Sequence, residues 1–380
     1  MRFTIGACGA TLLAVVLWDA FETIILPRRV SRRFRLTRLF YRSTWSPWRA
    51  TAQVLPPKRR EAFLGFFGPL SLLVLLGLWA TGIVLAFGLL QWAAGSAVSL
   101  VGATPGFGSD VYLSGTTFFT LGLGDVVPRS SLAKALTVIE AGTGFAFLAI
   151  VIGYLPVIYQ AFSRREGAIA LLDARAGSPP TAGELLWRHR TDSTGEALAE
   201  LLQEWEHWAA DVLESHLSYP VLAYFRSQHN NQSWLAALTT ILDASALVMV
   251  GLEGRCAQQA ALTFAMARHT AVDLAQVFST PPSERLEDRL SEAEFARLRT
   301  RLTDGGMQLR DGDGAVARLA ELRRMYEPYV VALARFLSVQ LPPWVRQVER
   351  PDNWQTSAWD RPRRPPTPES PGTRRAEDHF

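Results

Sequence analysis

The sequence has almost no cysteine and almost no lysine. Cys8 and Cys256 are the only cysteines among 380 residues, which excludes a disulfide framework and a cysteine-based metal set. Lysine occurs only at positions 58 and 134, so nearly all positive charge is carried by arginine. Charged side chains of either sign are missing from residue 62 to residue 109. Because about 20 apolar residues cross the hydrocarbon core, this part of the chain is predicted to lie in a membrane.

Three apolar segments are long enough to span a bilayer, over residues 1–26, 66–92 and 131–160. A cleaved signal peptide is the alternative for the first, but no small-residue cleavage site follows its apolar run. Residues 27–65 carry many basic residues against Glu61 alone, which predicts a basic cytoplasmic linker by the positive-inside rule. The protein is then a multi-pass protein of the plasma membrane, with its N-terminus outside and its C-terminal half in the cytoplasm.

A short stretch with the sequence Thr-Leu-Gly-Leu-Gly-Asp lies between the second and third segments. A pore for a large monovalent cation needs rings of backbone carbonyls, and hence backbone angles that residues with a Cβ avoid. Gly122 and Gly124 supply such angles, Thr120 would add a hydroxyl ring at the inner end, and Asp125 would add negative charge at the outer mouth. The predicted ion-selectivity filter consists of Thr120, Leu121, Gly122, Leu123, Gly124 and Asp125.

This stretch resembles the filter of the pore-loop superfamily of potassium channels, which is usually Thr-Val-Gly-Tyr-Gly-Asp. The resemblance covers roughly residues 62–162 and includes a pore helix, predicted over residues 111–119 with Ser109 and Asp110 as caps. It implies a passive, potassium-selective channel in which potassium is the permeant ion and no cofactor takes part. Leu123 stands where Tyr is usual and cannot make the phenolic hydrogen bond, so a weakly selective cation channel is the alternative.

The number of chains follows from the geometry of such a filter. One filter per chain cannot surround an ion, and the sequence has no internal repeat of the pore loop. A homotetramer is therefore expected.

The third segment is predicted to be the inner helix that lines the cavity. Its candidate cavity and gate residues are Glu140, Ala141, Gly144, Phe145, Leu148 and Ile152. Gly144 is either a hinge or a site of close helix packing. A carboxylate facing lipid costs about 2.5–3.5 kcal/mol, so Glu140 is expected either to tune cation occupancy or to hydrogen-bond a pore-helix threonine. Pro156 is expected to kink or end the helix.

Four arginines recur at every third residue in the linker, which is the spacing of a voltage-sensing helix: Arg29, Arg32, Arg35 and Arg38. Only two spans precede the pore, whereas a sensor domain needs four. Contact with anionic lipid headgroups is therefore the prediction for these arginines.

Residues 163–345 have the composition of an α-helical cytoplasmic domain. Capping-box patterns at Thr181, Ser193 and Ser291 predict three helix starts. Residues 235–250 resemble another span, but they are few and include Asp243, so a buried core helix is predicted. No strand-like run precedes a Gly-x-Gly-x-x-Gly pattern, so a nucleotide-binding regulatory domain is not indicated. Residues 346–380 are rich in proline and arginine and predict a disordered tail.

Together these features predict an all-α membrane protein. It has a potassium-channel-like pore module over residues 66–162, one extra N-terminal transmembrane helix and a helical cytoplasmic domain. Membrane lipids and further copies of the chain are the expected partners; a nucleic acid or a metal site is not expected, and the ligand of the cytoplasmic domain is not identified. No nucleophile, base and orienting group form a set, so an enzyme with a membrane anchor ranks last. A membrane-anchored interaction protein with a non-conducting pore loop is the main rival.

Overall fold

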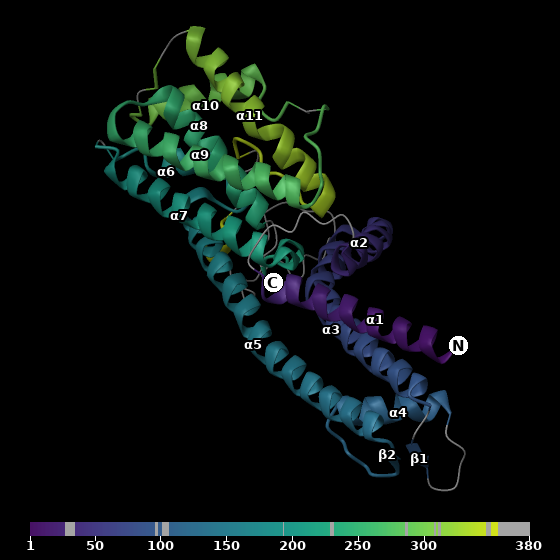
Figure 1. Cartoon of the computed structure of the whole chain (residues 1–380). Helices are drawn as coiled ribbons and strands as arrows, with labels where there is room; N and C mark the ends of the chain where they lie inside the picture. Colours follow the sequence, from purple (N-terminus) through teal and green to yellow (C-terminus); the bar gives the residue numbers. More distant parts are fainter. Residues whose placement is uncertain are drawn as a thin grey trace, which may run out of the picture. The chain divides into compact units, whose positions relative to one another are not determined.

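The computed structural model is predominantly helical and divides into two compact units, Met1–Gln160 and Ala161–Phe380 (Figure 1). The residues that it describes are 1–26, 35–95, 98–100, 106–192, 194–228, 232–285, 288–307, 309–310, 313–346 and 351–355.

The first unit begins with helices α1 (Arg2–Ile24), α2 (Leu36–Val54) and α3 (Pro57–Ala93). Helix α1 runs along α3 (Figure 1), and Gly9 lets the two backbones approach, because a Cβ there would lie 2.9 Å from the carbonyl oxygen of Ala86. Helix α2 packs on α3 through aromatic rings, with Trp48 stacked on Phe63 at 4.4 Å between centroids. Most of the predicted linker is therefore folded as helix.

A buried aspartate ties these three helices together. Asp19 of α1 accepts hydrogen bonds from the backbone N–H of Thr37 at 3.2 Å, from the Thr37 hydroxyl at 2.6 Å and from the indole N–H of Trp79 at 3.0 Å. Thr37 lies in the first turn of α2 and Trp79 lies in α3. The acid that interrupts the first apolar segment thus fixes where the next two helices pack.

The pore module follows, with β1 (Val98–Leu100), α4 (Phe107–Phe118), β2 (Val126–Pro128) and α5 (Ser131–Ala176). Strands β1 and β2 pair antiparallel, with Val98 opposite Pro128. Two predicted boundaries are wrong: α3 begins at Pro57 rather than at residue 66, and α5 continues through Pro156 to Ala176 rather than ending near residue 160. Proline at a first helical position is favourable because its missing N–H has no partner there.

The second unit contains helices α6 (Ala182–Arg188), α7 (Glu196–Ser218), η1 (Pro220–Tyr224), α8 (Trp234–Gly251), α9 (Gly254–Val277), α10 (Glu292–Asp304), α11 (Asp313–Leu337) and η2 (Asn353–Gln355). Helix α8 packs against α9, α11 and α6. Among the described helices, four are long and apolar enough to cross a membrane, and α8 is one of them, but 89% of its apolar window is buried inside the protein. The prediction of a core helix is confirmed.

The capping-box predictions have different outcomes. The full reciprocal pair forms between Ser291 and Glu294, and the Thr181 hydroxyl accepts from the N–H of Glu184. The pattern that begins at Ser193 starts on a residue outside the described ones, and α7 begins only at Glu196, with Gly195 as its N-cap residue.

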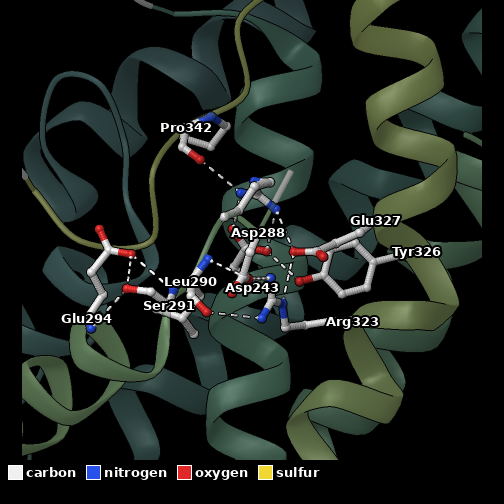
Figure 2. Close-up of polar contacts among 10 residues, drawn as sticks. Asp243, Asp288, Leu290, Ser291, Glu294, Arg323, Tyr326, Glu327 and Pro342 are labelled. Carbon is white, nitrogen blue, oxygen red and sulfur yellow. Dashed lines mark hydrogen bonds and ion pairs between the residues drawn. The ribbon is translucent and has the colours of Figure 1, made fainter. Parts of the chain in front are cut away.

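A buried ionic cluster joins α8, α11 and the segment that precedes α10 (Figure 2). Arg289 binds the fully buried carboxylate of Asp243 through two nitrogens, at 2.6 and 3.2 Å, and also binds Glu327 at 3.2 Å. Tyr326 donates its hydroxyl proton to the same aspartate. Burial raises the pKa of Asp243, and the charge of Arg289 opposes this effect. The aspartate that argued against a membrane span is therefore paired within the domain.

The prediction of a disordered tail over residues 346–380 is wrong for residue 346 and residues 351–355, which the structure describes. Asp352 is 2% exposed and binds Arg188 at 2.6 Å and Arg346 at 3.2 Å. These ion pairs attach the segment to the second unit. Residues 356–380 lie outside the described residues.

Candidate functional site

The loop from Phe119 to Asp125 follows helix α4 directly. Its first residues turn back over the helix end, since the N–H of Thr120 donates to Thr117 O at 3.0 Å and that of Leu121 donates to Thr116 O at 2.8 Å. Thr120, Gly122 and Gly124 have φ angles of 58°, 58° and 78°. The left-handed region therefore recurs at every second residue. A β-branched residue such as Thr120 rarely adopts it, and such a conformation costs about 1–3 kcal/mol.

Asp125 at the end of the loop is held by two hydrogen bonds. The Tyr112 hydroxyl of α4 donates to one carboxylate oxygen at 2.9 Å, and the N–H of Val126 donates to the other at 3.1 Å. Sequence reasoning missed Tyr112. It noted only that Leu123 cannot make a phenolic hydrogen bond, whereas the structure supplies a phenol from the preceding helix. The available signal was a tyrosine in the helix before the loop, but its partner depends on the turn between them.

The helix before this loop differs from the prediction at its start. Helix α4 begins at Phe107 rather than at residue 111, and its N-cap is Gly106. Ser109 and Asp110 therefore lie in its first turn and do not cap it, although Asp110 still places an acid at the positive end of the helix dipole. The negative end at Phe118 is directed to the start of the loop.

Glu140 lies behind α4 and is completely buried. The Ser114 hydroxyl of α4 contacts its carboxyl oxygen Oε1 and also donates to the carbonyl oxygen of Val84 in α3 at 2.7 Å. A serine hydroxyl has one proton, and the Val84 carbonyl can only accept. The Ser114 hydroxyl can therefore donate to Val84 and still bond to Glu140 when Glu140 carries a proton and donates it to Ser114.

This placement bears on one of the two expectations for Glu140, the structural hydrogen bond, while its role in cation occupancy stays a prediction. A hydrogen bond to the pore helix is present, with Ser114 in place of the expected threonine. The other carboxyl oxygen, Oε2, has no hydrogen-bond partner among the described residues. Ser114 joins helices α3, α4 and α5 at this point and was not identified from the sequence.

The remaining inner-helix residues fall on two faces of α5. Phe145, Leu148 and Ile152 share a face that is exposed in the single chain, at 69%, 54% and 64%, and Ala141 is partly exposed at the top of it. Gly144 is buried on the other face, where an added Cβ would clash with the carbonyl oxygen of Phe118. Gly144 is thus a close-packing glycine at the end of α4.

The predicted lipid-contacting arginines are described only in part. Arg29 and Arg32 lie outside the described residues. Arg35 is bonded within the protein, 3.6 Å from Glu22 and 3.2 Å from the Thr23 hydroxyl. Arg38 is exposed on α2. Of the two described arginines, Arg38 is the exposed one.

Comparison with known proteins supports the assignment of the pore module. Residues 72–160 match a family model described as an ion channel. The uncharacterised membrane protein YdjJ of Bacillus subtilis strain 168 is 24% identical over 142 residues, which cover 37% of this chain and 41% of that protein. No solved structure matches the chain. The matched residues contain α4, the Phe119–Asp125 loop and the membrane part of α5. Residues 72–160 are therefore similar to this ion-channel family, and the match covers the pore module alone.

Proposed function

We propose that the protein is a passive, potassium-selective channel in which four copies of the chain surround one conduction path. Residues Thr120–Asp125 of each copy form the selectivity filter. The proposal assigns no chemical reaction to the protein.

The observation that carries the proposal is the alternating backbone of this loop. In an extended strand, successive carbonyls point to opposite sides. Left-handed angles at Thr120, Gly122 and Gly124, with Leu121 and Leu123 outside that region, turn alternate peptide units over. Carbonyls of neighbouring residues can then face the same side. Rings of such carbonyls replace the hydration shell of a potassium ion.

Apolar side chains around the loop support assembly into a tetramer. Phe119, Leu121 and Leu123 are 61%, 61% and 63% exposed in the single chain. Exposed apolar side chains gathered in one place mark a surface that contacts another molecule. Neighbouring copies arranged around an axis would cover them, while the exposed face of α5 that carries Phe145, Leu148 and Ile152 would line the cavity.

The tether at Asp125 supports selectivity in the absence of a filter tyrosine. Tyr112 holds the carboxylate at the outer end of the loop, where the charge would attract cations. A filter held from the pore helix keeps its carbonyls in place without the phenol that Leu123 lacks.

The proposed orientation places the N-terminus outside and the second unit in the cytoplasm of a cell with this protein in its plasma membrane. The exposed basic residues Arg38, Arg42 and Arg59, on α2 and at the start of α3, then lie next to the anionic headgroups of the inner leaflet. Gln at all three positions is expected to weaken binding of the purified protein to vesicles that contain phosphatidylserine. Equal binding of this variant and the unchanged protein would remove the lipid role.

Ion flux through purified protein in liposomes tests the proposed function. Gly122→Ala places a Cβ at a φ of 58°, whereas Gly142→Ala, the control, lies in α5 at a position with no atom within 4 Å of an added Cβ. We expect potassium flux with little sodium flux for the unchanged protein and for Gly142→Ala, and loss of potassium selectivity or of flux for Gly122→Ala.

The other outcomes separate the alternatives. Equal flux of potassium and sodium that still depends on Gly122 would favour the weakly selective channel. Equal potassium flux in both variants would rule out the loop as the filter. Absence of flux in every variant would favour the non-conducting interaction protein.

A further inference from the structure

Helix α5 is one continuous helix of 46 residues, and its last turns belong to the core of the second unit. Ile169, Leu172 and Ala176 of these turns are at most 1% exposed. The same helix carries Phe145 and Ile152 in the first unit.

A buried arginine makes the most extensive polar contacts in this part of α5. Arg165 is 4% exposed and donates to the carbonyl oxygens of Leu222 at 2.9 Å and Phe225 at 2.8 Å, at the C-terminal end of η1. Its guanidinium also pairs with Glu166 at 2.8 Å. Helix α7 binds the backbone at the same place, since the Trp208 indole N–H donates to Arg165 O at 3.3 Å.

Arg165 also contacts a fully buried histidine of α7. His216 Nε2 lies 3.3 Å from Arg165 Nη1, and His216 Nδ1 lies 2.8 Å from the carbonyl oxygen of Val212. The Val212 carbonyl can only accept, so Nδ1 carries the proton and donates it there. Nε2 is then the lone-pair acceptor for the guanidinium. The contact requires a neutral imidazole.

We propose that the Arg165–His216 contact is an acid-sensitive latch, which holds the last turns of α5 in the second unit while His216 is neutral and releases them when it is protonated. A proton on Nε2 removes the acceptor and places two cationic N–H groups against each other. The consequence for the pore rests on the proposed channel function, whereas the latch itself does not.

The groups that face His216 come from several elements, and they favour the neutral imidazole over the protonated one. Helix α5 contributes the charge of Arg165, with Glu166 bound to that arginine. Helix α8 contributes the Trp234 ring, whose centroid lies 5.0 Å from that of the imidazole, and α7 contributes the neutral Ser215 hydroxyl at 3.2 Å from Nδ1. Burial, and then the positive charge of Arg165, hold the pKa of His216 well below its ordinary value.

The sign of the pH effect follows from proton linkage. The released state exposes His216, which then titrates near its ordinary pKa of 6.5. The latched state binds the proton much more weakly, so acid favours release. Above about pH 6.5, His216 is neutral in both states and the ratio of latched to released protein does not depend on pH. Below about pH 6.5 this ratio falls about tenfold per pH unit, until the pH reaches the lowered pKa of His216 in the latched state.

Hydrogen–deuterium exchange of the full chain measures this equilibrium without any ion flux. We expect the protection of residues 161–176, after correction for the intrinsic effect of pH on exchange, to fall about tenfold per unit between pH 6.5 and 5. Residues 292–304 of α10 serve as the internal reference. His216→Gln, which keeps an acceptor for Arg165 but cannot titrate, should flatten the dependence, whereas His207→Gln, at an exposed position of the same helix, should leave it unchanged.

A matched pair of arginine variants tests the other side of the contact. Arg165→Gln should lower the protection of residues 161–176 at every pH, and Arg164→Gln, at the exposed neighbouring position, should not. Protection of this segment that stays level in the unchanged protein from pH 7.5 to 5 would overturn the latch. The latch would also be overturned if exchange depended on pH in the same way in His216→Gln and in His207→Gln.

Potassium flux at the same pH values tests the consequence for the pore. A flux that changes between pH 7.5 and 5 in the unchanged protein, and stays constant in His216→Gln, supports regulation through the latch. Potassium flux that does not depend on pH, together with hydrogen–deuterium exchange that does, would overturn that regulation. Exchange that follows pH in a protein without any flux would leave the latch in place and refute the channel function.

Discussion

Replacing Gly144 by alanine tests how closely α5 must approach the end of the pore helix. An alanine Cβ at this position would clash with the carbonyl oxygen of Phe118, the last residue of α4. The contacting atom is backbone and cannot rotate away. The helices must therefore separate, and the residues that follow Phe118 are those of the proposed filter.

The size of the effect can be worked out by comparison with Gly142. Alanine favours a helix interior over glycine by roughly 0.5–1 kcal/mol, and this gain applies to both positions because both lie in α5. Overpacking costs typically about 1–3 kcal/mol and applies only to Gly144, since nothing lies within 4 Å of an added Cβ at Gly142. Gly144→Ala should thus be less stable than Gly142→Ala by about 1–3 kcal/mol.

Thermal unfolding of both variants in the same detergent, together with potassium flux in liposomes, measures the two effects. We expect Gly144→Ala to unfold at a lower temperature and to lose flux, and Gly142→Ala to retain both properties. Equal unfolding temperatures and equal flux would refute the packing argument. Loss of flux without loss of stability in Gly144→Ala would instead indicate a hinge.

Substitutions at Arg289, Tyr112 and Glu140 test three further contacts. Arg289→Leu leaves the buried carboxylate of Asp243 without its main partner and should destabilise the second unit by about 3–5 kcal/mol. The control Arg318→Leu breaks an exposed ion pair and should cost about 0–1 kcal/mol. Limited proteolysis of the second unit compares the two variants, and equal cleavage rates would contradict the reasoning. Tyr112→Phe removes the phenolic hydrogen bond at the end of the loop and should lower the potassium-over-sodium permeability ratio measured from reversal potentials, with no change if the tether is irrelevant. Glu140→Gln keeps a donor of the same shape and should preserve flux, whereas Glu140→Leu should reduce it; equal flux in these two variants would show that the hydrogen bond does not matter.

Several features of the site could be predicted because they depend on local pattern. Apolar segments long enough to cross a bilayer predicted the membrane helices, and glycines at alternate positions predicted where the backbone would be left-handed. Thr120 shows the limit of that reasoning, because its left-handed angle contradicts the preference of a β-branched residue. A conformation held by the surrounding turn cannot be read from intrinsic preference.

The sequence by itself determined the membrane segments, the position of the pore loop and the burial of the helix around Asp243. Each depends on hydrophobicity and backbone chemistry, which act within a few residues. Only the tertiary structure decided which groups meet: Tyr112 with Asp125, Glu140 with Ser114, and Arg165 with His216, a pair 51 residues apart. Buried polar groups must find partners, but the chain offers many partners of each kind, and packing of the helices selects among them.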